Sequence, residues 1–293
     1  MELDYVKLKE IKPVLAGYIR ESQSLLKLSS SPDEKVVHDV RVLLKKSRAA
    51  LKLSGPQLDM ESLNRDIRSL REAGQIMRFW REISVQRKIL KELKKEYPVI
   101  FDGLYENEKL TALLKKTEPV PEPSEEIKTG LEKIEELLNK TGYRIRFQSM
   151  DTIDPQQLLK KLDLTYSSVV DIYLISRNNP KPENLHDFRK KTKTFLYQLY
   201  FFRPLNPSVV KALEKKLENL TQNLGKFNDL AQLIKALEYK YSDGANLPAL
   251  DELIVKIREK QDGYLGKTWP TAYKIFCPGQ KLVNVLGFKL LVI

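Results

Sequence analysis

The stretch from Val37 to Leu53, VHDVRVLLKKSRAALKL, has a second copy in the middle of the chain, where Leu185 to Phe202 reads LHDFRKKTKTFLYQLYFF. The only two histidines of the chain, His38 and His186, occupy the same place in each copy. In both copies the histidine is followed by Asp at the next residue, by Arg at the third and by Lys at the seventh, which gives Arg41, Lys45, Arg189 and Lys193. A pattern that recurs in register over this length indicates duplication of a helical unit.

Each copy has the pattern of an amphipathic helix. Upstream of the first copy, Ser31, Pro32 and Glu34 are placed as a cap, a first-turn proline and the glutamate of a capping box, and residues 54–56 provide a stop. On a helical wheel the basic residues of this copy fall within an arc of roughly 80°; they are His38, Arg41, Lys45, Arg48 and Lys52. We expect this stripe to face away from the apolar side through which the helix packs. The alternative is an ordinary solvated face, but such faces usually mix acids with bases.

The second copy is predicted to form a helix from Pro182 to Phe202, on which His186, Arg189 and Lys193 share one side. Helical periodicity elsewhere predicts an all-α protein. Other helices are expected at Tyr5–Leu28, Leu58–Lys95, Ile100–Lys116, Glu125–Lys140, Val209–Tyr241 and Leu247–Leu265. A further helix is opened by Asp154 and Pro155 and is expected to end at Asn178, Asn179 and Pro180. The segment GYRIRFQSM, residues 142–150, alternates polar with apolar residues and is interpreted as a short extended segment. Beyond Trp269 the prolines argue against one continuous helix, and the apolar C-terminal segment is expected to dock on the core.

The proline-rich segment TEPVPEPS, residues 117–124, is predicted to be non-helical and to separate two halves. Each histidine helix is preceded by one predicted helix and followed by a longer one that contains a glycine, Gly74 or Gly225. We therefore interpret residues 1–293 as one domain with a first helical half, 1–116, a linker and connecting segment, 117–150, and a second helical half, 151–293. Duplication predicts pseudo-symmetry, which can bring both basic stripes to a shared groove.

The composition points to an anionic partner. A net charge of +12 and a pI near 9.4 favour polyanions such as nucleic acid, an anionic membrane surface or a phosphate-rich polymer. A single cysteine, Cys277, excludes an intrachain disulfide and a thiolate metal site, and is typical of a reducing compartment. Since the N-terminus lacks the apolar core of a signal peptide and no apolar run approaches about 18 residues, we expect a cytoplasmic protein without a membrane span.

At the two histidine helices the sequence resembles the CHAD family, the conserved-histidine α-helical domains. The first motif follows the family pattern of His, Arg at plus three, a base at plus seven and Arg at plus ten, and the later LGKFND, residues 224–229, matches the family's leucine-glycine and Asn-Asp segment. The resemblance covers most of the chain. It implies an all-α fold of two pseudo-symmetric four-helix bundles packed around a basic central cavity. It also implies binding of inorganic polyphosphate, with association with polyphosphate granules in some members.

The chain departs from the family pattern at a few positions. Thr194 and Leu196 stand where the second motif commonly has bases, and Met77 and Arg78 stand where the first repeat usually has an Arg-Asp pair. We therefore expect the second site to be weaker, or shifted toward Lys190 and Lys191, and the first stripe to anchor the ligand.

The residue types suit a phosphate polymer. Arginine offers a planar set of donors to phosphate oxygens, lysine a mobile charge, and histidine a donor that gains charge near neutral pH, which predicts tighter binding at lower pH. The candidate polyphosphate-binding residues are His38, Arg41, Lys45, Lys46, Arg48, Lys52, His186, Arg189, Lys190 and Lys193, with Arg71, Arg78 and Lys226 as weaker candidates.

Other functions were weighed against this prediction. Nucleic-acid backbone binding is the main alternative, with Tyr197 and the adjacent Tyr200, Phe201 and Phe202 as residues that can stack bases. An HD-type metal-dependent phosphohydrolase needs several histidines around its metal, and this chain has two in total. The sequence also lacks a GxxxxGK[ST] loop and an ExExK strand. We therefore expect a binding protein and not an enzyme, without a metal, a cofactor or a membrane partner, and leave its oligomeric state open.

Overall fold

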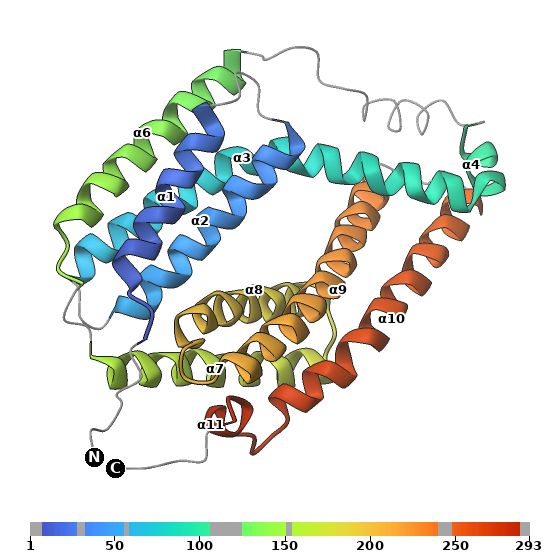
Figure 1. Cartoon of the computed structure of the whole chain (residues 1–293). Coiled ribbons are helices and arrows are strands. Elements are labelled where there is room, and N and C mark those ends of the chain that lie inside the picture. The colour runs from blue at the N-terminus through green and yellow to red at the C-terminus, as the bar shows by residue number, and fades with distance from the viewer. Residues whose placement is uncertain are drawn as a thin grey trace.

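The computed structural model describes residues 8–27, 33–55, 59–105, 125–150, 154–239 and 248–287, apart from the side chains of residues 79–84, 105 and 239. Within these ranges the regular structure is helical and contains no strand, as the sequence predicts (Figure 1). The helices are α1 (Ile11–Lys27), α2 (Glu34–Ser54), α3 (Met60–Glu96), α4 (Pro98–Tyr105), α6 (Glu125–Phe147), α7 (Pro155–Asn178), α8 (Pro182–Leu199), the 3₁₀ helix η2 (Tyr200–Phe202), α9 (Pro207–Tyr239), α10 (Pro248–Phe276) and α11 (Leu282–Val285).

The helices pack in two groups that follow chain order. In the first, α1 lies between α2 and α6, and α3 contacts both α2 and α6. In the second, α8 packs between α7 and α9, and α10 packs on α9. The groups meet where α2 contacts α8 and α7, and the C-terminal part of α3 extends with α4 across the ends of α9 and α10 (Figure 1). The two motif helices, α2 and α8, therefore lie at the junction of the two groups.

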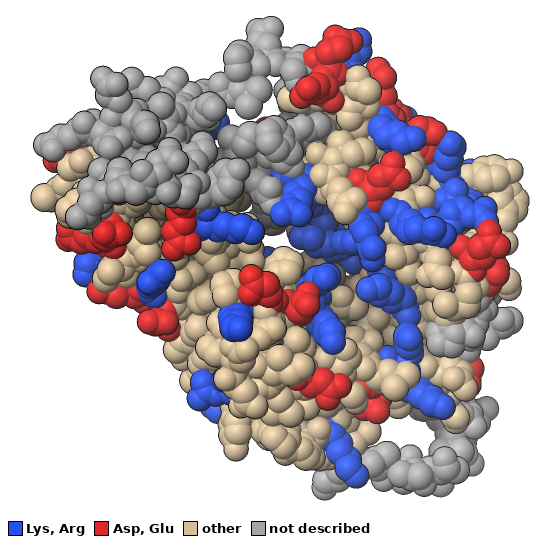
Figure 2. Space-filling model, turned by 180° about the vertical axis from the view of Figure 1, so that it is seen from behind, with Lys and Arg blue, Asp and Glu red and all other residues tan. Residues whose placement is uncertain are grey.

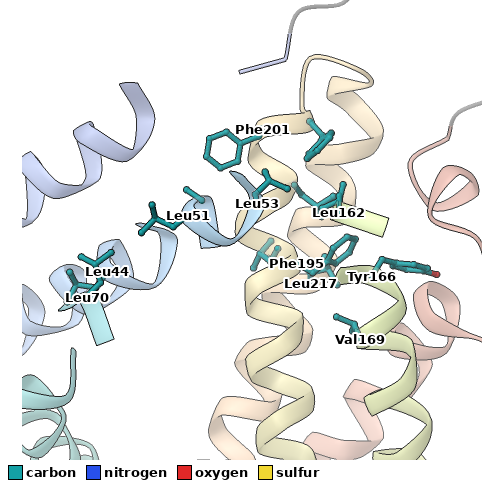
Figure 3. Close-up of a cluster of buried hydrophobic side chains, with 14 of the residues drawn as sticks. Leu44, Leu51, Leu53, Leu70, Leu162, Tyr166, Val169, Phe195, Phe201 and Leu217 are labelled. Carbon is teal, nitrogen blue, oxygen red and sulfur yellow. The ribbon is translucent and has the colours of Figure 1, made fainter. Parts of the chain in front are cut away.

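One hydrophobic core runs through this junction. Figure 3 shows Leu53 of α2 near Phe201 of the second group, with Leu51 further back along α2. Leu51, Leu53, Phe195 and Phe201 are fully or almost fully buried in one core cluster. A buried hydrogen bond reinforces the contact, because Gln198 Nε2 of α8 donates to the Ala49 carbonyl of α2 at 3.2 Å. A second, smaller core holds α4 and the end of α3 against α9 and α10, and includes Leu90, Leu93, Phe101, Leu233, Leu253 and Ile257.

Aspartates cap the starts of α2, α3 and α7. Asp154 caps α7 and accepts from Gln156 N at 2.9 Å, with Pro155 in the first turn as predicted. The predicted start of α2 is wrong: Asp33 is the cap and accepts from Val36 N at 2.7 Å, so Glu34 is the first helical residue and not the third position of a capping box. Ser31 and Pro32 lie outside the described residues.

The segment predicted to be extended is helical. Residues 142–147 continue α6, because Thr141 and Ile145, four residues apart, face the core, while Tyr143 and Phe147 pair on the exposed side with ring centroids 4.9 Å apart. A period-two pattern here concealed a helix with an aromatic pair on its solvent face.

The helix α6 belongs to the first group. It is fixed to α3 by Arg144, whose Nε donates to the fully buried Asp66 carboxylate at 2.5 Å, and by Gln148 Nε2, which donates to the same carboxylate at 3.0 Å. The division that assigned residues 117–150 to a connecting segment therefore separates α6 from the helices on which it packs. The proline-rich residues 117–124 lie outside the described ranges.

The prediction that prolines interrupt the last long helix is wrong at Pro270, since α10 runs through it to Phe276. Pro270 has no backbone N–H, so the carbonyl of Gly266, four residues earlier, lacks its helical donor. Both residues lie on the exposed side of α10, where water can hydrate that carbonyl. The opposite side stays buried through Ala272 and Phe276. Beyond the helix, Leu282 and Leu286 dock on the main core, as predicted for the part of the C-terminal segment that is described.

Candidate anion-binding site

The basic stripe of α2 lies opposite its apolar side, as the wheel predicts. Val40, Leu44 and Leu51 are fully buried, whereas His38 and Lys52 are exposed. The stripe residues between them are partly buried; these are Arg41, Lys45 and Arg48. Neighbouring helices thus enclose the middle of the stripe and leave its ends open to solvent.

The two arginines of the α2 stripe have different surroundings. Arg41 Nη1 donates a hydrogen bond to the Gly74 carbonyl of α3. Arg48 Nε is buried, and no described residue accepts a hydrogen bond from it. Burial lowers the pKa of Arg48, and the nearby Arg71 lowers it further, although the Tyr197 side chain opposes these effects. A guanidinium remains charged under such shifts, so Arg48 is a desolvated cation with an unused donor.

His186 of α8 is held by the following long helix. Its Nδ1 lies 3.1 Å from Oδ1 of Asn228 on α9. A carboxamide oxygen only accepts, so this contact is a hydrogen bond when Nδ1 carries a proton.

Arg189, one turn further along α8, lies flat against α9. Its Nε donates to the Thr221 carbonyl at 3.1 Å. Gly225 makes room for the guanidinium, because a Cβ at this residue would lie 3.1 Å from Arg189 Nε and 3.2 Å from Nη2. The motif arginines of both copies therefore bind the backbone of the helix that follows.

Lys193 is the most strongly perturbed cation of the second stripe. It is partly buried, with Nζ 5.5 Å from the centre of the Tyr197 ring. Burial lowers the pKa of Lys193 to about 8, with further lowering by the positive charges of Arg189 and of Lys46 on α2, while Glu218 of α9 opposes the shift. Because Lys193 belongs to α8 and Lys46 to α2, this repulsion acts between the two motif helices.

Lys52 marks a second place where cations of the two groups meet. Its pKa is lowered by burial and then by four positive charges, those of Arg48, Arg71, Lys190 and Lys161. These groups come from four helices, α2, α3, α8 and α7. Because Lys52 is still exposed, water screens the repulsion there more than at Lys193. Figure 2 shows lysines and arginines gathered around a hollow near the middle of the face that it views.

The predicted residues divide by position. Charge interactions join the candidate residues in two sets, Lys193 with Lys46 and Arg189, and Lys52 with Arg48, Arg71 and Lys190. Lys190 also pairs with the exposed Asp187 at 3.3 Å. Lys226 is exposed, with Nζ 5.5 Å from the Tyr264 ring centre, and Arg78 is exposed on α3. Lys161 was missed by the sequence analysis, because it belongs to an ordinary Lys-Lys pair in α7 and only packing places it beside Lys52.

The aromatic residues considered for base stacking do not form an open surface. Phe201 and Phe202 are buried in the core. Tyr200 packs edge-on against Phe201 and has Lys9 Nζ 4.0 Å and the Arg203 guanidinium carbon 4.7 Å from its ring centre. Tyr197 is partly buried beside Lys193.

Two kinds of feature are absent from the part of the chain that the structure describes. The described residues contain no group of three His, Cys, Asp or Glu side chains arranged to hold a metal ion. No helix within the described ranges combines the length and the apolar character that crossing a bilayer requires.

Comparison with known proteins gives a family match. The search of curated proteins finds no relative of this chain. The family model described as CHAD domain matches residues 19–238, which extend from α1 to α9 and include both motif helices. A match over well over half of the chain, at the residues that build the basic site, shows that this protein belongs to the CHAD domain family.

Proposed function

We propose that this protein binds inorganic polyphosphate along the basic hollow between its two helical groups, with α2 and α8 supplying the principal contacts. The observation that carries the proposal is the gathering of lysines and arginines around one hollow of the surface (Figure 2), together with the direct packing of the two motif helices, α2 with Lys46 and Lys52 and α8 with Lys190 and Lys193. A fold that holds like charges together in a partly desolvated place is stabilised by any polyanion that enters.

The chemistry of the polymer fits this arrangement. Polyphosphate carries about one negative charge per phosphate, so its binding should release counterions as nucleic-acid backbone binding does. Arg48 presents a buried donor without an acceptor among the described residues, and arginine donors match phosphate oxygens. The lysines of both stripes supply positive charge on the two sides of the hollow. The bound polyphosphate crosses from the stripe of α2 to that of α8.

We further propose that the two groups are pseudo-symmetric four-helix bundles, α1, α2, α3 and α6 in one and α7, α8, α9 and α10 in the other, around a basic cavity. The order of contacts along the chain supports this pairing. So does the junction itself: Ala49 and Gln198, which form a hydrogen bond, are 149 residues apart, and the two histidines are 148 residues apart. Two helices related by a two-fold axis are expected to cross at equivalent residues.

Nucleic-acid backbone binding is the alternative, since its phosphates also meet basic side chains. Single-strand binding without sequence preference relies on accessible aromatic surfaces, and here Phe201 and Phe202 are buried. We therefore propose preference for the polymer without bases, and a binding role rather than a catalytic one. Retention of the protein on polyphosphate granules would follow from such binding.

Titration with polyphosphate of defined length tests the proposal. We expect saturable binding that weakens steeply with salt, and an upward shift in melting temperature when polyphosphate is added. A competition with single-stranded RNA and DNA of equal charge decides between the ligands. Displacement of polyphosphate by a modest excess of nucleic acid would contradict the preference, and absence of saturable binding would contradict the function.

A further inference from the structure

One face of α9 runs in antiparallel register along the binding side of α8. Asn228 lies against His186, Gly225 and Thr221 lie against Arg189, and Glu218 acts on the charge of Lys193. Each binding group of the second motif thus has its own counterpart on α9. Side chains that are held in this way do not have to be ordered when a ligand arrives, so less conformational entropy is lost on binding.

Gly225 is the closest of these contacts. The guanidinium of Arg189 lies against Gly225, with Nε and Nη2 at 3.1 and 3.2 Å from the ideal Cβ position, so that an added Cβ would push it aside by a few tenths of an ångström. A glycine inside a helix lowers stability by roughly 1 kcal/mol relative to alanine. The clash involves the end of a flexible side chain, so a larger residue would displace Arg189 and leave the helix backbone in place.

The corresponding face of α3 is different. Gly74 of α3 corresponds to Gly225 of α9. When the two helices are aligned on these glycines, Met77, Leu70 and Ile67 of α3 stand at the positions of Asn228, Thr221 and Glu218 of α9. Met77 and Leu70 are buried in the core. Gly74 has more room than Gly225, because a Cβ there would meet only Leu44 Cδ1, at 3.9 Å. At these positions, therefore, α3 offers apolar side chains where α9 offers polar ones.

We infer that Gly225 and Asn228 are positioning residues for the anion site, which hold Arg189 and His186 of the second motif in place before the ligand binds. This inference rests on the proposed binding of polyphosphate. The departures at Thr194 and Leu196 remove charge from the second motif, whereas the α9 contacts fix the charges that remain.

A double-mutant cycle tests the role of Gly225. Gly225→Ala should weaken polyphosphate binding roughly tenfold, the effect of misplacing one charge-assisted contact. In an Arg189→Ala background the same substitution should have no further effect, because the side chain that it displaces is gone. The control is Gly74→Ala, whose Cβ has room and which should bind within about twofold of the original protein. Additive losses in the cycle would overturn the inference.

Further readouts separate this role from a purely structural one. Gly225→Ala should keep or raise the melting temperature, since alanine favours the helix, so weaker binding would not reflect unfolding. Asn228→Ala should weaken binding about threefold, as expected for loss of one hydrogen bond that orients His186, while Asn219→Ala, at an exposed position of the same helix, should not. Absence of binding by the unsubstituted protein would refute the proposed function; normal binding together with full affinity of Gly225→Ala would refute this inference alone.

Discussion

The affinity for polyphosphate should depend on the protonation of Lys193. In the unliganded protein its pKa is lowered from 10.5 to about 8 by burial and by the charges of Arg189 and Lys46, with Glu218 opposing. The neighbouring helix α7 contacts α8 through Lys191, whose Nζ donates to the Ser168 carbonyl at 3.4 Å. A bound polyanion favours the charged form and returns the pKa toward its ordinary value, so binding takes up a proton wherever the free lysine is neutral.

The size of the effect follows from that pKa. Near pH 7 most of the free protein has a charged Lys193, whereas near pH 9 about one molecule in eleven does. If the bound lysine stays protonated throughout, the affinity falls about tenfold between these two pH values, or by about 1.4 kcal/mol. Near pH 8 each binding event takes up about half a proton.

Isothermal titration at constant ionic strength measures both quantities. Affinities are compared across this pH range, and titrations in buffers of different ionisation enthalpy give the number of protons taken up. Lys193→Met is the control, since it removes the titrating group and should flatten the profile; Lys216→Met, at an exposed position of α9, should not. An equal fall in Lys193→Met and the original protein would refute the assignment.

Two other predictions concern stability. Lys193→Met should stabilise the unliganded protein below about pH 8 by roughly 1–3 kcal/mol, since a lowered lysine pKa means that folding disfavours the charge. The gain in stability should shrink as the pH rises from about 8 toward 10.5, because in this range Lys193 keeps its proton in the unfolded protein and loses it in the folded protein. A gain in stability that does not depend on pH would contradict this reasoning. Arg144→Ala should destabilise the protein by roughly 3–5 kcal/mol in urea unfolding, because it leaves the buried Asp66 carboxylate without its cation, whereas Arg146→Ala, on the exposed side of α6, should change stability little.

The periodicity of the sequence predicted most helices and the orientation of the basic stripe, because both depend on local pattern. The start of α7 was predicted correctly, since Asp154 and Pro155 form a strong local start signal, and its end falls within the stretch 178–180 where the sequence predicts a stop. The errors arose where tertiary context decides. Tyr143 and Phe147 lie on an exposed face of α6 and gave an alternation that resembles a strand, and Pro270 is tolerated because its side of α10 meets water.

The candidate site was predictable as a set of residues but not as an arrangement. The repeat identified the stripes, because both copies carry the same spacing of His, Arg and Lys. Packing alone shows that Arg41 and Arg189 bind backbone carbonyls of the following helices, and that Lys161 stands beside Lys52. These relations join residues far apart in the chain, and no local pattern encodes them.

Salt dependence of polyphosphate binding tests most directly whether both motif helices contact one polyanion. The site variant replaces Lys46, Lys52, Lys190 and Lys193 with glutamine. The matched control removes the same charge from lysines that pair with glutamates elsewhere, at Lys27, Lys140, Lys256 and Lys260.

The site variant should bind more weakly, and the slope of log affinity against log salt should fall by about three, since each lost phosphate contact removes about 0.7–0.9. The control should keep the original slope within about one, because its lysines contribute only general attraction. Equal slopes for the two variants would mean that net charge, and not the paired stripes of α2 and α8, accounts for binding.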